Sequence, residues 1–253
     1  NSEFSWSEGI SLITGKKILI PSQLIYLSYA YKPNEPVIYP GISTGAAGGS
    51  SISGALVRGV CEIVERDAFM IFYLNKLEAG RINLKRIDDS SVKKLLGILE
   101  RYNMKIFTFD ITTDIKIPTC LSIVVDRTGI GKAIALGLKS DLNQIAAITG
   151  SIEETFNSRS WLRTEYEKGA KRIPLSDLLK NSDIRTRGLL WYPTEVINNL
   201  GFLLKSPFSK LKMLTKEIKR TSGQELKYIL KLFKNQGYDI LYKDITVLAF
   251  KKM

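Results

Sequence analysis

The chain contains a run of small residues between Gly41 and Ser51, which directly precedes its longest helical pattern. Apolar residues recur there at helical spacing and predict a helix from about Ser53 to Lys76. Small residues ahead of a helix let backbone N–H groups approach an anion at the helix N-terminus. The run therefore predicts a place for an anionic ligand at the start of this helix.

The predicted helix carries two acidic residues, Glu62 and Glu65, on one face. Their three-residue spacing brings the two carboxylates side by side, where both can reach one cation. Pairs of hard oxygen ligands of this kind suit Mg²⁺. The alternative is an exposed face on which Glu62 pairs with Arg66, four residues later. Apolar neighbours such as Val64 argue against full exposure.

A second predicted helix, from about Leu142 to Tyr166, repeats this spacing with Glu154 and Asn157. One oxygen donor is here an amide, and Arg159 follows closely enough to face a phosphate. By itself the pattern is also typical of a surface helix. Two such helices in one chain nevertheless predict a site where carboxylates bind Mg²⁺ and the ion binds the phosphates of a nucleotide.

The 253 residues include no histidine, which excludes every mechanism that uses imidazole as a base, as a nucleophile activator or as a metal ligand. The two cysteines, Cys61 and Cys120, lie in apolar runs, so we expect buried structural thiols. No standard phosphate-binding loop is present, because Gly129-Ile130-Gly131-Lys132 is too short and the small-residue run lacks lysine. Catalysis would therefore rest on carboxylates, amides, hydroxyls, lysine and arginine.

Apolar runs bounded by turn residues predict strands, and helical spacing predicts two further helices. The segments alternate without a regular strand–helix–strand rhythm, which favours an α+β fold over a doubly wound sheet. Ser222 to Glu225 has the pattern of a capping box at the start of the last helix, which Gly237 ends. The predicted strands are Lys17–Ile20, Leu24–Tyr31, Ile106–Thr112, Thr119–Val125, Lys132–Leu138 and Asp239–Tyr242, and the other helix is Ser90–Tyr102.

Two segments of the sequence resemble each other. A shift of 134 residues places the helix-ending Asn103 on Gly237 and Asp110-Ile111-Thr112 on Asp244-Ile245-Thr246. A helix–cap–strand order recurs by chance, but the matched tripeptide supports a duplication. We expect one domain of two pseudo-repeated α/β halves, each of which contributes an acidic helix to a shared cleft; the halves are residues 1–140 and 141–253.

Charge is distributed unevenly. Residues 168–253 hold 18 of the 37 basic residues but only 7 of the 25 acidic ones, so almost all of the net +12 belongs to this last third. Such a region indicates a local anionic partner, or else a solvated helix face rich in lysine. No apolar run approaches the ~20 residues of a membrane span. We therefore expect no membrane partner, and, because nothing suggests a disulfide framework, a cytoplasmic protein. Few aromatic residues interleave with the basic ones, so we expect no nucleic-acid partner.

Two segments closely resemble the signature of the YcaO family. The first joins the loop Ser43–Gly49 to Gly59-Val60-Cys61-Glu62-Ile63-Val64-Glu65-Arg66-Asp67-Ala68, and is similar to the family's small-residue loop and Glu-x-x-Glu-Arg-Asp-Ala helix. The second, Ile152–Arg159, is similar to the family's second acidic helix. The resemblance is strong over residues 12–167 and weak over 222–250.

This resemblance implies an enzyme that uses ATP and Mg²⁺ to activate a backbone amide of a peptide or protein. In the family, a side-chain thiol or hydroxyl attacks the amide to give an azoline, or sulfide attacks it to give a thioamide. The amide oxygen leaves as phosphate. By analogy, the Mg²⁺ ligands would be Glu62, Glu65 and Glu154, and the nucleotide contacts would be Ser43, Gly45, Arg66, Asn157 and Arg159.

The chain departs from the family at both ends. The N-terminal nucleotide-binding segment and the proline-rich C-terminal end have no counterpart, so we expect a fragment or a shortened member. A second hypothesis therefore stays open, a non-catalytic accessory protein or peptide-binding scaffold of a modification system. The resemblance also implies a TfuA-like or peptide-recognition partner protein, and a homodimer is a further expectation.

Overall fold

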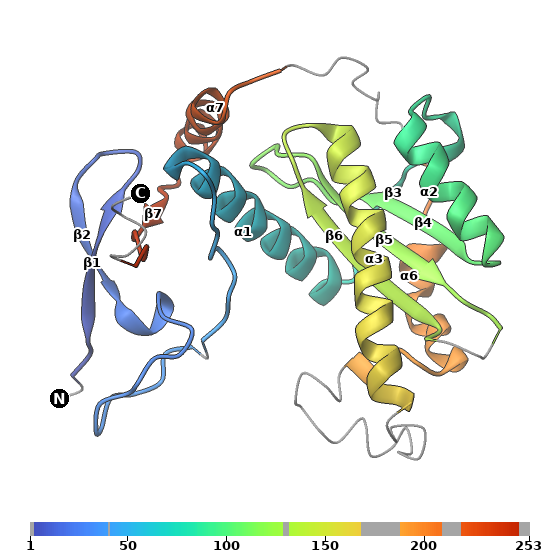
Figure 1. Ribbon diagram of the computed structural model, residues 1–253, viewed down its shortest axis with the longest axis horizontal. Coiled ribbons are helices and arrows are strands. Elements are labelled where there is room, and N and C mark those ends of the chain that lie inside the picture. Colours follow the sequence, from blue (N-terminus) through green and yellow to red (C-terminus); the bar gives the residue numbers. More distant parts are fainter. Residues whose placement is uncertain (1–2, 40, 129–131, 168–187, 209–218, 248–253) are drawn as a thin grey trace. The chain divides into compact units, whose positions relative to one another are not determined.

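The structure, a computed structural model, describes residues 3–39, 41–128, 132–167, 188–208 and 219–247 (Figure 1). The chain divides into two compact units, residues 1–63 with 220–253 and residues 64–219. The division falls within helix α1 (Ile52–Leu74), whose bounds confirm the long predicted helix. Each unit contains an antiparallel sheet together with helices, which confirms a mixed α+β fold.

The first unit contains a three-stranded antiparallel sheet in the order β2-β1-β7. The central strand β1 (Trp6–Ser11) pairs along its length with β2 (Lys17–Pro21), and its last residues pair with β7 (Leu241–Tyr242). The Ser11 hydroxyl donates to Oδ2 of Asp239 at 2.6 Å, just before β7. The Asp239 side chain, which also accepts the Ile13 N–H at 3.3 Å, thus helps the backbone pairing of β1 with β7 to join segments near the two ends of the chain.

Helix α7 (Ser222–Asn235) begins with a capping box. The Thr221 side chain accepts the Gln224 N–H, and the Gln224 side chain accepts the Thr221 N–H in return. The box was predicted with Ser222 as its first residue, and this assignment is wrong by one position. Thr221-x-x-Gln224 satisfies the same pattern, so the helix starts one residue earlier.

The strand predicted for Leu24–Tyr31 is wrong, because the chain forms a 3-10 helix (Ser22–Leu24) and turns there. The buried carboxylate of Glu35 accepts hydrogen bonds from the Gln23 amide at 3.0 Å and from the Tyr29 hydroxyl at 2.8 Å. Burial raises the pKa of Glu35, but these bonds and two from backbone N–H groups outweigh it and lower the pKa to about 2. A polar anchor therefore folds this segment, and the apolar pattern alone could not show it.

The second unit contains a four-stranded antiparallel sheet in the order β3-β4-β5-β6. Strand β5 coincides with its prediction and is buried along its whole length. Strand β6 starts two residues later than predicted and ends two residues later. The strands are β3 (Gly80–Arg81), β4 (Lys105–Asp110), β5 (Thr119–Val125) and β6 (Ile134–Ser140).

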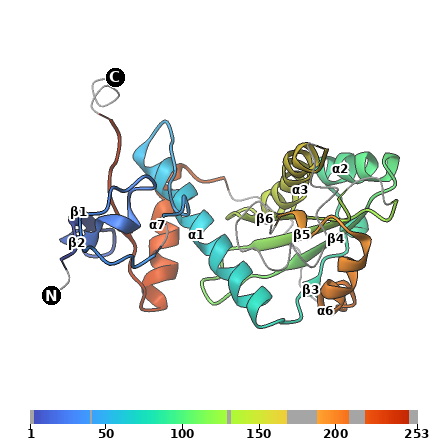
Figure 2. The same cartoon turned by 90° about the horizontal axis from the view of Figure 1, so that it is seen from below.

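Helices cover both faces of this sheet (Figure 2). Helices α2 (Ser90–Arg101) and α3 (Gln144–Glu167), both close to their predicted bounds, lie on one face. Between them and the sheet lies an apolar cluster that includes Val92, Val124 and Ile148. On the other face, a 3-10 helix (Thr194–Leu200) and α6 (Gly201–Leu204) pack on a second cluster. Two covered faces explain why β5 reads as a continuous apolar run.

The two similar sequence segments share a local structure. Asn103, after α2, and Gly237, after α7, both have a left-handed backbone, with φ of 54° and 76°. In each following segment an aspartate, Asp110 or Asp244, accepts the N–H of the threonine two residues later. However, β4 lies inside its sheet, whereas β7 lies at an edge. The shared turn accounts for the tripeptide; a duplication is not shown, and the halves divided at residue 140 stay a prediction.

Both cysteines are buried and unbridged, as predicted. Burial raises the pKa of the Cys120 thiol on β5, so this thiol stays protonated and unreactive. In the described part of the chain, no helix is long and apolar enough to span a membrane.

Candidate functional site

The small-residue loop packs directly against α1 within the first unit. Gly45 has a φ of 86°, and a Cβ there would lie 3.0 Å from the Ile63 side chain. A Cβ on Gly59 would lie only 2.7 Å from the Gly45 carbonyl oxygen. Arg58 adds a hydrogen bond from Nη1 to the Gly48 carbonyl at 2.8 Å. The glycines thus let loop and helix backbones touch, and Ser43 of the loop stays exposed.

In the second unit, two acidic side chains meet at the free edge of β6. The Ser140 N–H donates to Oε2 of Glu65 at 3.1 Å, and the Leu138 N–H donates to Oε2 of Glu154 at 2.6 Å. Since β6 is the last strand of its sheet in the described part of the chain, these N–H groups have no partner strand there on that side. Helices α1 and α3 therefore direct one carboxylate each to neighbouring positions on a single strand.

The surroundings of Glu65 disfavour its charged form. Burial raises the pKa of Glu65, whose side chain is among the buried charged groups, and the negative charge of Glu154 raises it further. The Ser140 N–H and the positive charges of Arg66 and Lys139 lower this pKa only in part. Arg66 lies beside the pair, with Nε 3.7 Å from Oε1 of Glu65. Two nearby carboxylates with incomplete compensation form a place where a cation would be stabilised.

A glycine on β6 allows this approach. A Cβ on Gly137 would lie 2.0 Å from the Ser151 carbonyl oxygen and 2.7 Å from the Thr155 nitrogen, both on α3. Real Cβ atoms do not come so close to backbone atoms, so α3 can pack here only on glycine. Close packing brings Glu154, beside Thr155, within reach of the strand. Gly137 was not identified from the sequence, where an isolated glycine in an apolar run was the only sign.

Arg159 lies one and a half turns beyond Glu154 on α3 and is held elsewhere. Its Nη1 donates to the Lys132 carbonyl at 2.8 Å, and its Nη2 forms an ion pair with the buried Asp126. Burial raises the pKa of Asp126, but hydrogen bonds from Thr128 and this ion pair outweigh it and lower the pKa. Burial and the Arg159 charge lower the pKa of Lys132 to about 8. Arg159 thus has an evident structural role at the entry to β6.

The remaining predicted site residues are not all brought together. Glu62, Ser43 and Gly45 belong to the first unit, and Glu65 and Glu154 to the second, so a single site formed by all of them stays a prediction. Asn157 is exposed on α3. Among the described residues, no three or more histidine, cysteine or acidic side chains form a group that could hold a metal ion. The pair alone fits Mg²⁺, which proteins commonly bind through one or two carboxylates together with substrate phosphates.

A family model described as YcaO cyclodehydratase, ATP- and Mg²⁺-binding, matches residues 1–251. The chain belongs to the YcaO family. The resemblance seen in the two acidic helices is therefore confirmed over nearly the whole length of the chain.

Solved structures show the same YcaO fold. A heterocyclase in complex with substrate and cofactor superposes with a TM-score of 0.72 at 21% identity, over 93% of this chain and 30% of that one. YcaO from Methanopyrus kandleri, bound with AMPPCP and Mg²⁺, gives 0.68 at 13% identity, over 96% and 60%. The E. coli microcin synthetase McbBCD complex with pro-MccB17 bound gives 0.64 at 20% identity, over 91% and 57%. At these identities the likeness shows the fold alone.

Two curated relatives share part of the YcaO sequence. A protein of Rhizobium leguminosarum bv. trifolii, described as an uncharacterised protein in the tfuA 3′ region, is 30% identical over 47% of this chain and 29% of its own length. An uncharacterised protein of Methanothermobacter thermautotrophicus is 21% identical over 63% of this chain and 42% of its own. The matches thus span less than half the length of either relative.

Proposed function

We propose that this YcaO protein binds ATP and Mg²⁺ and activates a backbone amide of a peptide or protein substrate. The observation that carries the proposal is the pair formed by Glu65 and Glu154 on the free edge of β6. The two carboxylates come from different helices, and burial together with mutual repulsion raises the pKa of Glu65. Burying two neighbouring carboxylates without a cation costs free energy of folding. A purely structural role would not require both groups to be charged, so the pair favours a cation-binding role.

In the proposed reaction the amide oxygen attacks the terminal phosphate of ATP, and ADP leaves. ATP supplies the phosphoryl group that turns the amide oxygen into a leaving group. Glu65 and Glu154 would hold Mg²⁺, with Glu62 as a third ligand and Asn157 nearby. Ser43 and Gly45 of the loop, and the guanidinium group of Arg66, would contact the nucleotide. Arg159 would do so only by leaving its ion pair with Asp126.

The second step would add a nucleophile to the activated amide carbon and expel phosphate. A side-chain thiol or hydroxyl would give an azoline, and sulfide would give a thioamide. The relative described by its place in the tfuA 3′ region favours the thioamide product and a TfuA-like partner protein. The absence of histidine fits this chemistry, because phosphoryl transfer depends mainly on positioning and charge stabilisation.

Nucleotide binding tests the proposal directly. Calorimetry with ATP should show binding that requires Mg²⁺. Glu65→Gln and Glu154→Gln each keep an oxygen that can accept the β6 N–H but remove a negative charge. Each should weaken Mg²⁺-dependent ATP binding about tenfold or more.

Glu153→Gln is the matched control, because Glu153 precedes Glu154 on α3 but is exposed. It removes the same charge one position away and should leave ATP binding unchanged. Equal losses in all three variants would indicate a general charge effect and contradict the site. Absence of ATP binding by the unaltered chain would instead support the non-catalytic scaffold.

A further inference from the structure

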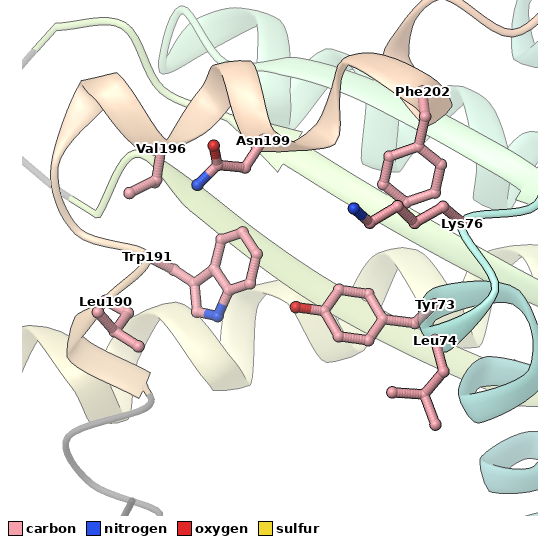
Figure 3. A pocket seen from close by; sticks show the side chains of 8 residues that line it. All are labelled: Tyr73, Leu74, Lys76, Leu190, Trp191, Val196, Asn199 and Phe202. Atoms are coloured by element: carbon pink, nitrogen blue, oxygen red, sulfur yellow. The ribbon is translucent and has the colours of Figure 1, made fainter. Parts of the chain in front are cut away.

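A cavity of about 590 Å³ opens in the second unit, lined by residues other than the acidic pair. One wall is the end of α1, and the opposite wall is the segment that includes the 3-10 helix Thr194–Leu200 (Figure 3). Its volume lies within the range of sites that bind small molecules or peptide side chains. The residues that line it include Tyr73, Lys76, Trp191, Val196, Asn199 and Phe202.

The apolar walls are fixed by the core. Val196 is buried in the apolar cluster of this sheet face, and Trp191 and Phe202 pack against the same cluster. The Trp191 carbonyl accepts the Ile134 N–H at 3.1 Å, which ties this wall to the first residue of β6. The cavity is therefore largely preformed, so a ligand would lose little free energy in ordering it.

The opposite wall is positioned by α1. The Tyr73 ring stacks on Phe69, with centroids 5.4 Å apart and an interplanar angle of 16°, and Phe69 packs against the core cluster. Figure 3 shows the Tyr73 hydroxyl and the Lys76 ammonium pointing from the end of α1 into the space between the two walls, whereas the Asn199 amide lies on the opposite wall and points toward Val196. The aromatic cavity thus carries polar groups on both of its walls.

The polar groups have a definite charge preference. Lys76 is a cation that makes no ion pair with any described residue, and no acidic side chain is among those that line the cavity. Tyr73 and Asn199 add neutral hydrogen-bond donors. One cation and neutral donors above aromatic walls complement a carboxylate that is attached to a large apolar group.

Lys76 also occupies an unusual backbone position. Its N–H bonds to the Tyr73 carbonyl at 3.3 Å, and the next N–H, of Leu77, bonds to the Phe72 carbonyl at 3.0 Å. This pair of bonds ends α1 as a Schellman motif, whose left-handed residue is commonly glycine. Lys76 takes that place with a φ of 50°. The side chain therefore stands where stability alone would favour glycine.

We propose that this cavity binds the C-terminal residue of a peptide, with an aromatic or large aliphatic side chain between Trp191 and Phe202 and its carboxylate at Lys76. The choice of a peptide rests on the proposed function. The recognition itself rests on the cavity and on Lys76, which makes no ion pair with a described residue.

The test uses the whole chain and acetyl-Gly-Phe as the probe. Calorimetry should detect binding of the free acid, and binding at least fivefold weaker for acetyl-Gly-Phe-amide, which lacks the charge, and for acetyl-Gly-Ala, which lacks the ring. Lys76→Gly should cause a similar loss for the free acid, and Lys76→Arg should keep most of the binding. Lys94→Ala, which removes an exposed lysine of α2, should change nothing.

Lys76→Gly is informative because it suits the left-handed backbone and should not lower the melting temperature. Lost binding with unchanged melting would support a ligand role for the ammonium group. Equal binding of acid and amide, undiminished binding by Lys76→Gly, or no binding of any probe would overturn the proposal. Glu65→Gln should bind acetyl-Gly-Phe normally. Failure of ATP binding would therefore contradict the proposed function and leave this cavity site standing.

Discussion

Glu62 and Glu65 lie three residues apart on one helix, yet the structure gives them different surroundings. Glu65 is 7% exposed and bonds to a strand edge, whereas Glu62 is half-buried and belongs to the other unit. The sequence predicted the acidic face and its separation from solvent. The family resemblance named Glu65 and Glu154 together as ligands of one ion, but the residue spacing could not predict the strand edge on which they meet, because that edge belongs to a distant strand.

Replacing Glu65 by Gln should stabilise the protein in Mg²⁺-free buffer at neutral pH. Because the folded-state pKa of Glu65 is raised above that of the unfolded chain, its charge opposes folding at every pH above both values. This penalty should shrink as the pH falls through the folded pKa and vanish below the unfolded value. As the pH falls from 8 to 4, the melting temperature of the unaltered chain should therefore approach that of Glu65→Gln. Thermal melts across this range measure the difference between the two.

With saturating Mg²⁺ and ATP, the unaltered chain should instead melt at a higher temperature than Glu65→Gln, since the bound cation stabilises the charged form of Glu65. A variant that melts below the unaltered chain in Mg²⁺-free buffer at pH 7 would show that the carboxylate is needed for the fold itself.

Replacing Gly137 by Ala should destabilise the fold by about 1–3 kcal/mol, because the new methyl group would overlap the α3 backbone. The helix must shift away from β6, which also separates Glu154 from the Leu138 N–H. Urea titration should measure the loss of stability, and calorimetry should show weaker Mg²⁺-dependent ATP binding.

Gly97→Ala on α2 is the matched control, since a Cβ at Gly97 meets nothing within 4 Å. It should be neutral or stabilising by up to about 1 kcal/mol. Equal stability of both variants would mean that α3 does not need glycine for its approach.

At the scale of elements, prediction succeeded where one physical effect dominated. The apolar run of β5 and the periodic face of α2 were correct to within one residue, because each reports burial directly. Strand β1, Trp6–Ser11, was not predicted, since glycine and serine interrupt its pattern and its pairing with β2 supplies the stability. The region after Gln23 was predicted wrongly because a buried glutamate, rather than apolar spacing, organises it.

Replacing Thr221 by Ala should destabilise α7 by about 1 kcal/mol, because it removes the side chain that accepts the Gln224 N–H. Ser222→Ala is the control, since Ser222 is the first helical residue and does not cap the helix. It should change the free energy of unfolding by less than about 0.5 kcal/mol. Denaturant titration of both variants measures the difference. A larger loss for Ser222→Ala would assign the cap to the residue that the sequence pattern first indicated.

At the scale of the whole molecule, sequence neighbours and spatial neighbours differ. The first unit combines residues 1–63 with 220–253, and its sheet pairs β1 with a strand more than two hundred residues later. No local pattern specifies such a pairing. The family signature identified the chain's class because its motif spans a loop and a helix whose backbones touch through Gly45 and Gly59. The motif therefore indicates a specific packing of the loop against the helix and not only a residue composition.

Binding of ATP with Mg²⁺ should raise the melting temperature, because a ligand that binds only the folded protein stabilises it by mass action. A hundredfold excess over Kd corresponds to about 2.7 kcal/mol, or roughly 5–10 °C for a protein of this size. ATP with EDTA should give a much smaller shift, and Glu154→Gln should lose the shift that Glu153→Gln keeps. If the two units melt separately, the transition of residues 64–219 should move, because that unit holds Glu65 and Glu154. A shift that persists in Glu154→Gln would place the nucleotide away from the strand edge, and the acidic pair would then serve only to cap β6.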